Sequence, residues 1–520
     1  MSRTRIVGGV YTKITGGDYK MYTEGDTIIT AAGKNDFANA ESVIIGNNPE
    51  KAPLLVMNDP ESINFLVHFE IDENNYDGSF GFDWMRNEYK HICPYYAKLK
   101  EEYRDCNDNT LWKPQGREYF IPWVALRKGQ KNVKLKISIE RLNTLPIEDT
   151  DTIQFTQQNG ISFSVADINV KEIINKGFVE VELYCNTVSE KDRLYKVFDG
   201  KGNIVGKLNI FRNKTTYQLD VRFVEVKFKG RVTQDPPENA KNMNDVEKLI
   251  LIRDSGNIDI LSRRIYNFTD NTKTFVEEGK IETQSLNQIE TIDKWKRYIE
   301  DNEDFFKKLL NQSLIDYNPI KENNEIKYEV MEIDLGTLII GNNPLETKNW
   351  LIRESFKDLK PNSNSVACDL YKLREGIIAH YLLSYLKDYT LNAVQEVIKG
   401  VTFFILPIMI DGPTNDETLD ALSDDLDKNN IENSSRYVLL LRHTDELRKN
   451  TIVHEAAHTL GLTHTYREEG NDIQPKVFFR KDETKNIMDK GKKFKDNNLF
   501  WKWQWETMIK DSDLKPIDNE

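Results

Sequence analysis

Residues 454–464 read His454-Glu455-Ala456-Ala457-His458-Thr459-Leu460-Gly461-Leu462-Thr463-His464. His454 and His458 are four residues apart, so a helix places both imidazoles on one face, one turn apart. Two imidazole nitrogens at that spacing can bind one zinc ion at about 2.0–2.1 Å. Glu455 directly follows the first histidine, and a carboxylate there can take a proton from a water molecule beside the ion. This stretch predicts a helix that carries a metal site.

A third ligand depends on Gly461. Glycine adopts left-handed backbone angles and ends helices, so the chain can turn and bring His464 back toward the ion. Three protein ligands leave one position for water, which is the arrangement of a catalytic rather than a structural zinc site. The alternative is an ordinary amphipathic helix. However, three of the chain's 7 histidines fall in this stretch, and packing alone gives no reason for that spacing beside a glutamate.

The complete pattern of three histidines, Glu455 and Gly461 resembles the zinc signature of the metzincin metallopeptidases. The Thr465-Tyr466 pair after the third histidine and the segment Asn486-Ile487-Met488-Asp489 are similar to the pappalysin-like branch of that family. The resemblance covers residues 400–511. It implies that Met488 forms the Met-turn beneath the metal, although an ordinary buried methionine is the alternative. It also implies a C-terminal helix near residues 499–510 behind that turn.

The resemblance further implies a zinc-dependent endopeptidase that holds one zinc ion on His454, His458 and His464 and uses Glu455 as general base. The strand predicted at residues 437–441 would then pair with an extended protein or peptide substrate. One departure concerns the residues after Met488. They are Asp489, Lys490 and Gly491, so the tyrosine that some relatives carry there is missing. The Tyr466 hydroxyl is the candidate to stabilise the oxyanion instead.

The rest of the chain divides by composition into predicted domains. Residues 1–60 indicate a small β module or an extended arm. Short strands of alternating polarity predict a β domain at 61–147 and a β-sandwich-like domain at 148–232. Two prolines within residues 235–239 mark a predicted boundary. Residues 240–520 are expected to form an α+β metzincin-like domain, in which the apolar run at 401–410 is a buried strand.

Composition limits the function classes. Of the 520 residues, 39% are hydrophobic, which is enough for packed cores, and the net charge is −13. That charge argues against nucleic acid as the main partner. No run approaches the roughly 18 apolar residues of a membrane span, and no Sec signal peptide is visible, so we expect a soluble protein, cytoplasmic as synthesised. The 4 cysteines form no metal or disulfide pattern.

Three alternatives stay open. Residues 1–232 can be a binding module for a secretion machine or a target protein, in an effector exported by a non-classical or contractile system. The zinc domain would then cut a narrow target or an amide of a cell-wall peptide. A second alternative is a pseudo-enzyme that binds peptides without cutting them, which the intact Glu455 disfavours. Finally, the acidic loop 411–427, with Asp424, Asp425 and Asp427, can bind Ca²⁺, although its spacing matches no standard calcium loop.

Overall fold

A computed structural model describes most of the chain from residue 63 onward, and all described residues belong to one compact unit, residues 60–520. The longer described ranges are 63–234, 282–334, 399–406, 436–441, 449–467, 475–489, 497–511 and 514–519. Short segments are described at 246–252, 257–264, 268–269, 274–275, 361–362, 365–366, 374, 376–382 and 421–422. The module predicted at residues 1–60 lies outside the described residues.

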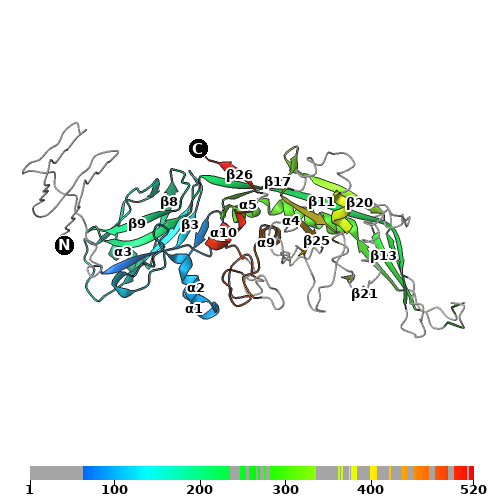
Figure 1. Cartoon of the computed structure of the whole chain (residues 1–520), viewed down its shortest axis with the longest axis horizontal. Helices are drawn as coiled ribbons and strands as arrows, with labels where there is room; N and C mark the ends of the chain where they lie inside the picture. Colours follow the sequence, from blue (N-terminus) through cyan, green and yellow to red (C-terminus); the bar gives the residue numbers. More distant parts are fainter. Residues whose placement is uncertain are drawn as a thin grey trace, which may run out of the picture. The chain divides into compact units, whose positions relative to one another are not determined.

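Two antiparallel-rich sheets build a β-sandwich (Figure 1). The first sheet has the order β1 (Phe65–Glu70), β4 (Lys134–Arg141), β8 (Val179–Cys185), β6 (Ile161–Phe163). The second has the order β2 (Gly81–Asp83), β3 (Trp123–Ala125), β10 (Ile204–Ile210), β9 (Arg193–Asp199), β5 (Thr152–Gln154), β7 (Asp167–Asn169). Apolar residues at every second position, such as Leu135 and Ile137 of β4, bury one face of each sheet in a common core.

The predicted division at residues 147/148 is not present in this sandwich. Strand β4 pairs with β8, and β3 pairs with β10, so residues 61–147 and 148–232 complete each other's sheets. Neither segment has enough strands to cover its own apolar face. The two predicted β domains are therefore one.

Strand β11 (Thr215–Gln234) is 20 residues long and links the sandwich to a second, larger sheet. Along its length it pairs in turn with the following strands: β26 (Lys515–Asp518), β17 (Ile315–Pro319), β20 (Tyr328–Asp334), β23 (Val401–Ile405) and β12 (Val246–Ile252). Strand β12 continues the sheet into β13 (Asn257–Arg264) and β16 (Glu282–Asn287). The boundary predicted at 235–239 lies outside the described residues, and β11 and β12 on either side of it pair with each other.

The far side of this sheet carries the strands nearest to the histidine helix. Strand β25 (Tyr437–Leu440) lies parallel to β23, and β24 (Ala421–Leu422) pairs antiparallel with β25. All five residues of β23 are buried, as the apolar run predicted. Helix α9 (Thr451–Thr459) packs against β25 and against α5 (Glu303–Asn311), which follows α4 (Gln288–Asp301). Helix α10 (Lys502–Met508) falls within the predicted C-terminal helix.

One hydrophobic core joins the sandwich to the histidine-bearing half of the chain. It contains Tyr89 and Trp123 from the sandwich segment and Trp501 and Trp505 from around α10. These aromatic rings bury large apolar areas, which is a main source of stability. The sandwich and the histidine-bearing half thus share one core and are not separate domains joined by a linker.

Buried polar contacts reinforce that shared core. The carboxylate of Asp83, 1% exposed, accepts hydrogen bonds from the Tyr103 hydroxyl at 2.8 Å and from the Lys502 backbone N–H at 3.0 Å. Burial raises the pKa of Asp83 to about 6. The Trp501 indole N–H donates to the Tyr89 hydroxyl at 3.1 Å. Asp83 is therefore a titratable link between the sandwich and the start of α10.

Among the helices that the structure describes, none has the length and apolar character needed to cross a membrane.

Candidate metal centre

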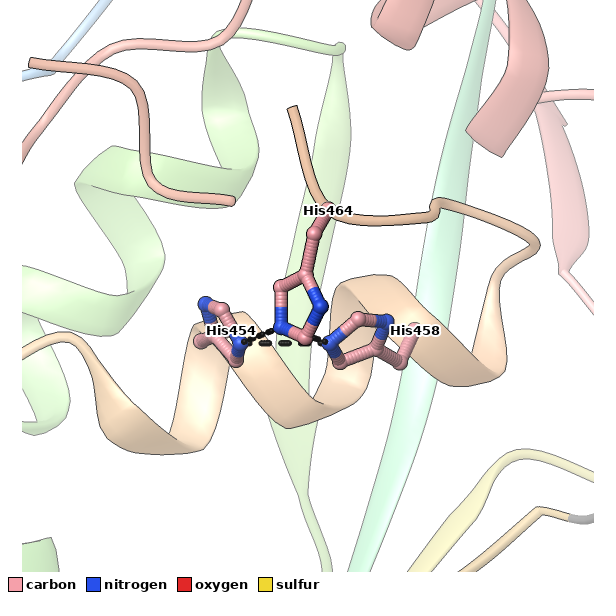
Figure 2. Close-up of side chains that lie close together, drawn as sticks. All are labelled: His454, His458 and His464. Carbon is pink, nitrogen blue, oxygen red and sulfur yellow. Dashed lines mark hydrogen bonds between the residues drawn. The ribbon is translucent and has the colours of Figure 1, made fainter. Parts of the chain in front are cut away.

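Three imidazoles converge on one point beside helix α9 (Figure 2). The Nε2 atom of His458 lies 3.1 Å from that of His454 and 3.2 Å from that of His464, and the remaining pair is 3.3 Å apart. Zinc–nitrogen bonds of 2.0–2.1 Å in a tetrahedral arrangement separate ligand nitrogens by about 3.3–3.4 Å. The three nitrogens therefore lie close to the positions that a single metal ion requires.

The opposite ring nitrogens fix which atoms face the centre. His454 Nδ1 lies 2.8 Å from the carbonyl oxygen of Ile487, and His458 Nδ1 lies 2.8 Å from that of Leu462. A carbonyl only accepts, so each Nδ1 carries the proton and donates it. In the neutral ring the Nε2 atoms then present lone pairs, as metal ligands must.

The protonation state of His458 agrees with this arrangement. Burial, followed by the neighbouring His464 and His454, lowers the pKa of His458 well below its ordinary value. The ring is therefore neutral at pH 7. Lone pairs that face each other at 3.1–3.3 Å repel unless a cation lies between them, and the chemistry of these donors fits such a cation.

Local sequence explains how α9 presents the ligands. Its apolar residues Ile452, Val453, Ala456 and Ala457 are at most 1% exposed, while His454 and His458 are half-buried on the other side. Gly461 has φ +89° and ends the helix, as predicted, with the Leu462 N–H bonded to the Ala457 carbonyl at 3.0 Å. This turn returns His464 to the centre.

Glu455 follows His454 on the same helix, and its side chain is half-buried. A carboxylate that keeps partial contact with solvent can exchange protons with water. Helix α9 thus places Glu455 directly after the first histidine of the candidate metal site, and its role as general base stays a prediction.

Met488 lies in a tight turn that contacts both ligand segments. The turn begins with the Asn486 side-chain oxygen, which accepts from the Met488 N–H at 2.9 Å. The Ile487 carbonyl accepts from His454, and the Met488 carbonyl accepts from the Thr465 N–H at 3.1 Å. Met488 itself is fully buried. The turn thus contacts His454 directly and the segment of His464 through the neighbouring Thr465.

Residues that the sequence analysis missed hold this turn in place. Asp489 is fully buried, and its carboxylate accepts from the Asp482 N–H at 2.8 Å and from the Thr484 N–H and hydroxyl at 2.9 and 2.7 Å. Asn486 and Gln504 exchange two amide hydrogen bonds, of 2.7 and 3.1 Å. The Asn-x-Met-Asp pattern in the sequence could have indicated that Asp489 belongs to the turn. Nothing in the local sequence around Gln504 indicates that it pairs with Asn486.

Tyr466 packs its ring on His464. The ring centroids are 5.0 Å apart with an interplanar angle of 11°, and the Lys481 ammonium lies 5.2 Å from the tyrosine ring centroid. Tyr466 is 5% exposed. Its described contact therefore orients the third ligand, and the oxyanion role of its hydroxyl stays a prediction.

Two further expectations concern the edge of the site. The sequence predicted an edge strand at 437–441 that pairs with substrate, but β25 is not an edge strand, because β24 pairs with it at Ala421↔Leu440 and Leu422↔Leu439. The calcium candidates Asp424, Asp425 and Asp427 lie outside the described residues. The edge nearest to α9 is thus β24.

Comparisons with protein-family models, with curated proteins and with solved structures give no match to this chain.

Proposed function

We propose that this chain is a zinc-dependent endopeptidase of the metzincin type, with the ion on His454, His458 and His464. The observation that carries the proposal is the convergence of three Nε2 atoms within 3.3 Å of one another, two of them with their Nδ1 protons held by backbone carbonyls. Three imidazole nitrogens suit zinc, and three rather than four protein ligands favour a catalytic site.

The chemistry follows from residues around the site. A zinc ion held by the three histidines would supply Lewis-acid chemistry, which polarises a carbonyl and lowers the pKa of water. Glu455 accepts the proton of the attacking water and passes it to the leaving amine. Tyr466 and the turn at Met488 keep the histidines oriented, so that the site is ready before substrate binds.

The sheet beside α9 supports the peptidase assignment over other hydrolases. In the sheet, β24 follows the parallel strands β23 and β25 and pairs antiparallel with β25. It is the last strand on that side of the sheet among the described residues. An extended peptide can add to such an edge through backbone hydrogen bonds, which recognise any polypeptide. A protein or peptide is therefore the substrate class, and an amide of a cell-wall peptide is the narrower variant.

The experiment compares the wild-type chain with Glu455→Gln, and measures both zinc content and cleavage of denatured protein and of cell-wall peptides. We expect one zinc per chain in both. We expect cleavage by wild type, suppressed by a chelator, and a loss of about 10²–10⁴-fold in Glu455→Gln, the usual contribution of a general base. His458→Gln should lose the zinc as well. Full turnover by Glu455→Gln, or wild type that purifies without affinity for zinc, would contradict the proposal.

The alternative of an independent N-terminal binding module has less support. Tyr89 and Trp123 lie in the same core as Trp501 and Trp505, so the sandwich would expose a large apolar face if it worked apart from the zinc-binding half. We infer that it is a built-in part of the enzyme.

A further inference from the structure

A continuous series of contacts leads from the third histidine to the outer surface of the sandwich segment. Tyr466 stacks on His464 and forms a β-bridge with Phe479. The preceding residue, Phe478, packs edge-on against the ring of Tyr95 at a centroid distance of 4.7 Å. The loop at 475–481 therefore connects the metal centre to helices α1 (Tyr89–Ile92) and α2 (Tyr96–Leu99).

This junction is held by more than the aromatic pair. The Arg480 N–H donates to the Ile92 carbonyl at 2.9 Å, and Lys476 forms an ion pair of 2.6 Å with Glu102, whose side chain is 6% exposed. The loop and the two short helices are thus joined by these contacts into one rim, which connects through Tyr466 to the candidate metal centre.

The rim exposes an aromatic ring among cations. Tyr95 is 51% exposed, which is unusual for a ring that already packs against another aromatic side chain. The exposed cations within residues 88–102 and 475–483 are Lys90, Lys98, Lys476, Arg480 and Lys481. The acidic residues there are Glu88, Glu101, Glu102, Asp482 and Glu483, of which Glu88 and Glu101 are exposed. Exposed cations outnumber exposed acids here, although the whole chain carries a net charge of −13.

We propose that Tyr95, Phe478, Lys90, Lys98, Arg480 and Lys481 form a docking surface for an acidic segment of the protein substrate that also carries an aromatic or apolar side chain. Exposed aromatic rings contribute the apolar contact, and the surrounding cations select negative charge and raise the association rate. The inference rests on the proposed function, since it names the substrate class of the same site.

A polypeptide fits this surface better than nucleic acid does. The rest of the chain is strongly acidic and would repel a long polyanion, whereas a short acidic stretch meets only the local positive charge. The rim is also joined to the metal centre through Tyr466, so a peptide that reaches the ion can extend over it.

The test measures binding and does not depend on turnover. Full-length Glu455→Gln, loaded with zinc, is titrated against three fluorescein-labelled peptides that alternate phenylalanine with glutamate, glutamine or lysine. Fluorescence anisotropy should show the glutamate peptide binding most tightly, with affinity that falls as salt is raised. Adding Lys90→Glu and Lys98→Glu to this variant should weaken binding of the glutamate peptide by about tenfold. Tyr95→Ala, added without the lysine changes, should weaken binding of all three peptides.

Matched controls separate this surface from general electrostatics. The pair Lys176→Glu and Lys201→Glu changes the net charge equally on exposed residues elsewhere in the sandwich and should leave binding unchanged. Equal binding of the glutamate and glutamine peptides, or equal effects of the two charge-reversal pairs, would overturn the docking surface. A single-stranded oligonucleotide that binds as tightly as the glutamate peptide would overturn the choice of a peptide. Each result stands whether or not the wild-type chain cleaves protein.

Discussion

Replacing Gln504 by leucine tests whether helix α10 holds the turn at Met488. Gln504 is fully buried, and its side-chain oxygen accepts from Asn486 at 2.7 Å and from the Trp501 N–H at 2.8 Å. Leucine has a similar volume, so the change removes hydrogen bonds and leaves little cavity. Two donors are left buried without this partner, and each costs about 1–3 kcal/mol. We expect the free energy of unfolding to fall by about 2–6 kcal/mol, a large part of the usual 5–15 kcal/mol.

The same change should reach the metal centre. Asn486 begins the turn whose Ile487 carbonyl orients His454, so a looser turn should weaken zinc binding by about 10–100-fold, the usual cost of losing a partner of a metal ligand. Competition with a chromophoric chelator measures the affinity, and urea unfolding followed by tryptophan fluorescence measures stability. Glu506→Gln on the same helix is the control. It weakens a half-buried i,i+4 pair with Lys502 and a 4.0 Å pair with Arg212, and should cost about 0.5–1 kcal/mol. If Gln504→Leu keeps both the wild-type zinc affinity and the wild-type urea midpoint, the turn is not held through this amide pair.

Two other substitutions probe the turn after α9 and the contact between the halves of the chain. Gly461→Ala should cost about 1–2 kcal/mol and weaken zinc binding, because φ +89° strains any side chain, while the new Cβ would meet Thr507 only at an ordinary 3.8 Å. Gly461→Asn, which tolerates that conformation better, should cost less in urea unfolding; equal costs would point to a steric cause. Asp83 has a pKa raised from 3.8 to about 6, so the folded state holds its proton more tightly, and its contribution to stability is lost as pH rises through about 6. Between pH 4 and 7 the urea midpoint should therefore fall more steeply with pH in the wild type than in Asp83→Asn. Parallel pH profiles of the two midpoints would refute the raised pKa of Asp83.

The sequence predicts the local geometry around the three histidines better than it predicts how the strands pair. The helix, the turn at Gly461 and the three histidines lie within eleven consecutive residues, so local periodicity and one glycine angle determine their geometry. The supports of the site come from distant segments. Gln504 reaches Asn486 across 18 positions, and the Trp501 indole donates to Tyr89 across 412. No local pattern encodes such contacts.

The two predicted domain boundaries, which the strand pairing crosses, have a similar cause. Alternating residues in β4 and β8 correctly indicate strands with one buried face, but they do not say which strand each one pairs with. Two prolines near residue 236 suggest a break, yet β11 before them and β12 after them pair from Gly230↔Ile252 to Gln234↔Lys248. Turn residues mark the end of a strand equally well in a hairpin and at a domain boundary.

The length of β11 also affects how late in its synthesis this protein can complete its fold. Apart from β12, which follows directly, its pairing partners are encoded about 100 to 300 positions later, and the last of them, β26, binds Thr215–Gln218 through Lys515–Asp518. The strand leaves the ribosome with unpaired edges and waits for most of the chain, which is the slow, non-local kind of assembly. The turn at Met488 and helix α10 emerge in the same final portion. A nascent chain therefore holds the histidines of α9 before it can fix their orientation, and ribosomes that stall early release a fragment without an ordered metal centre.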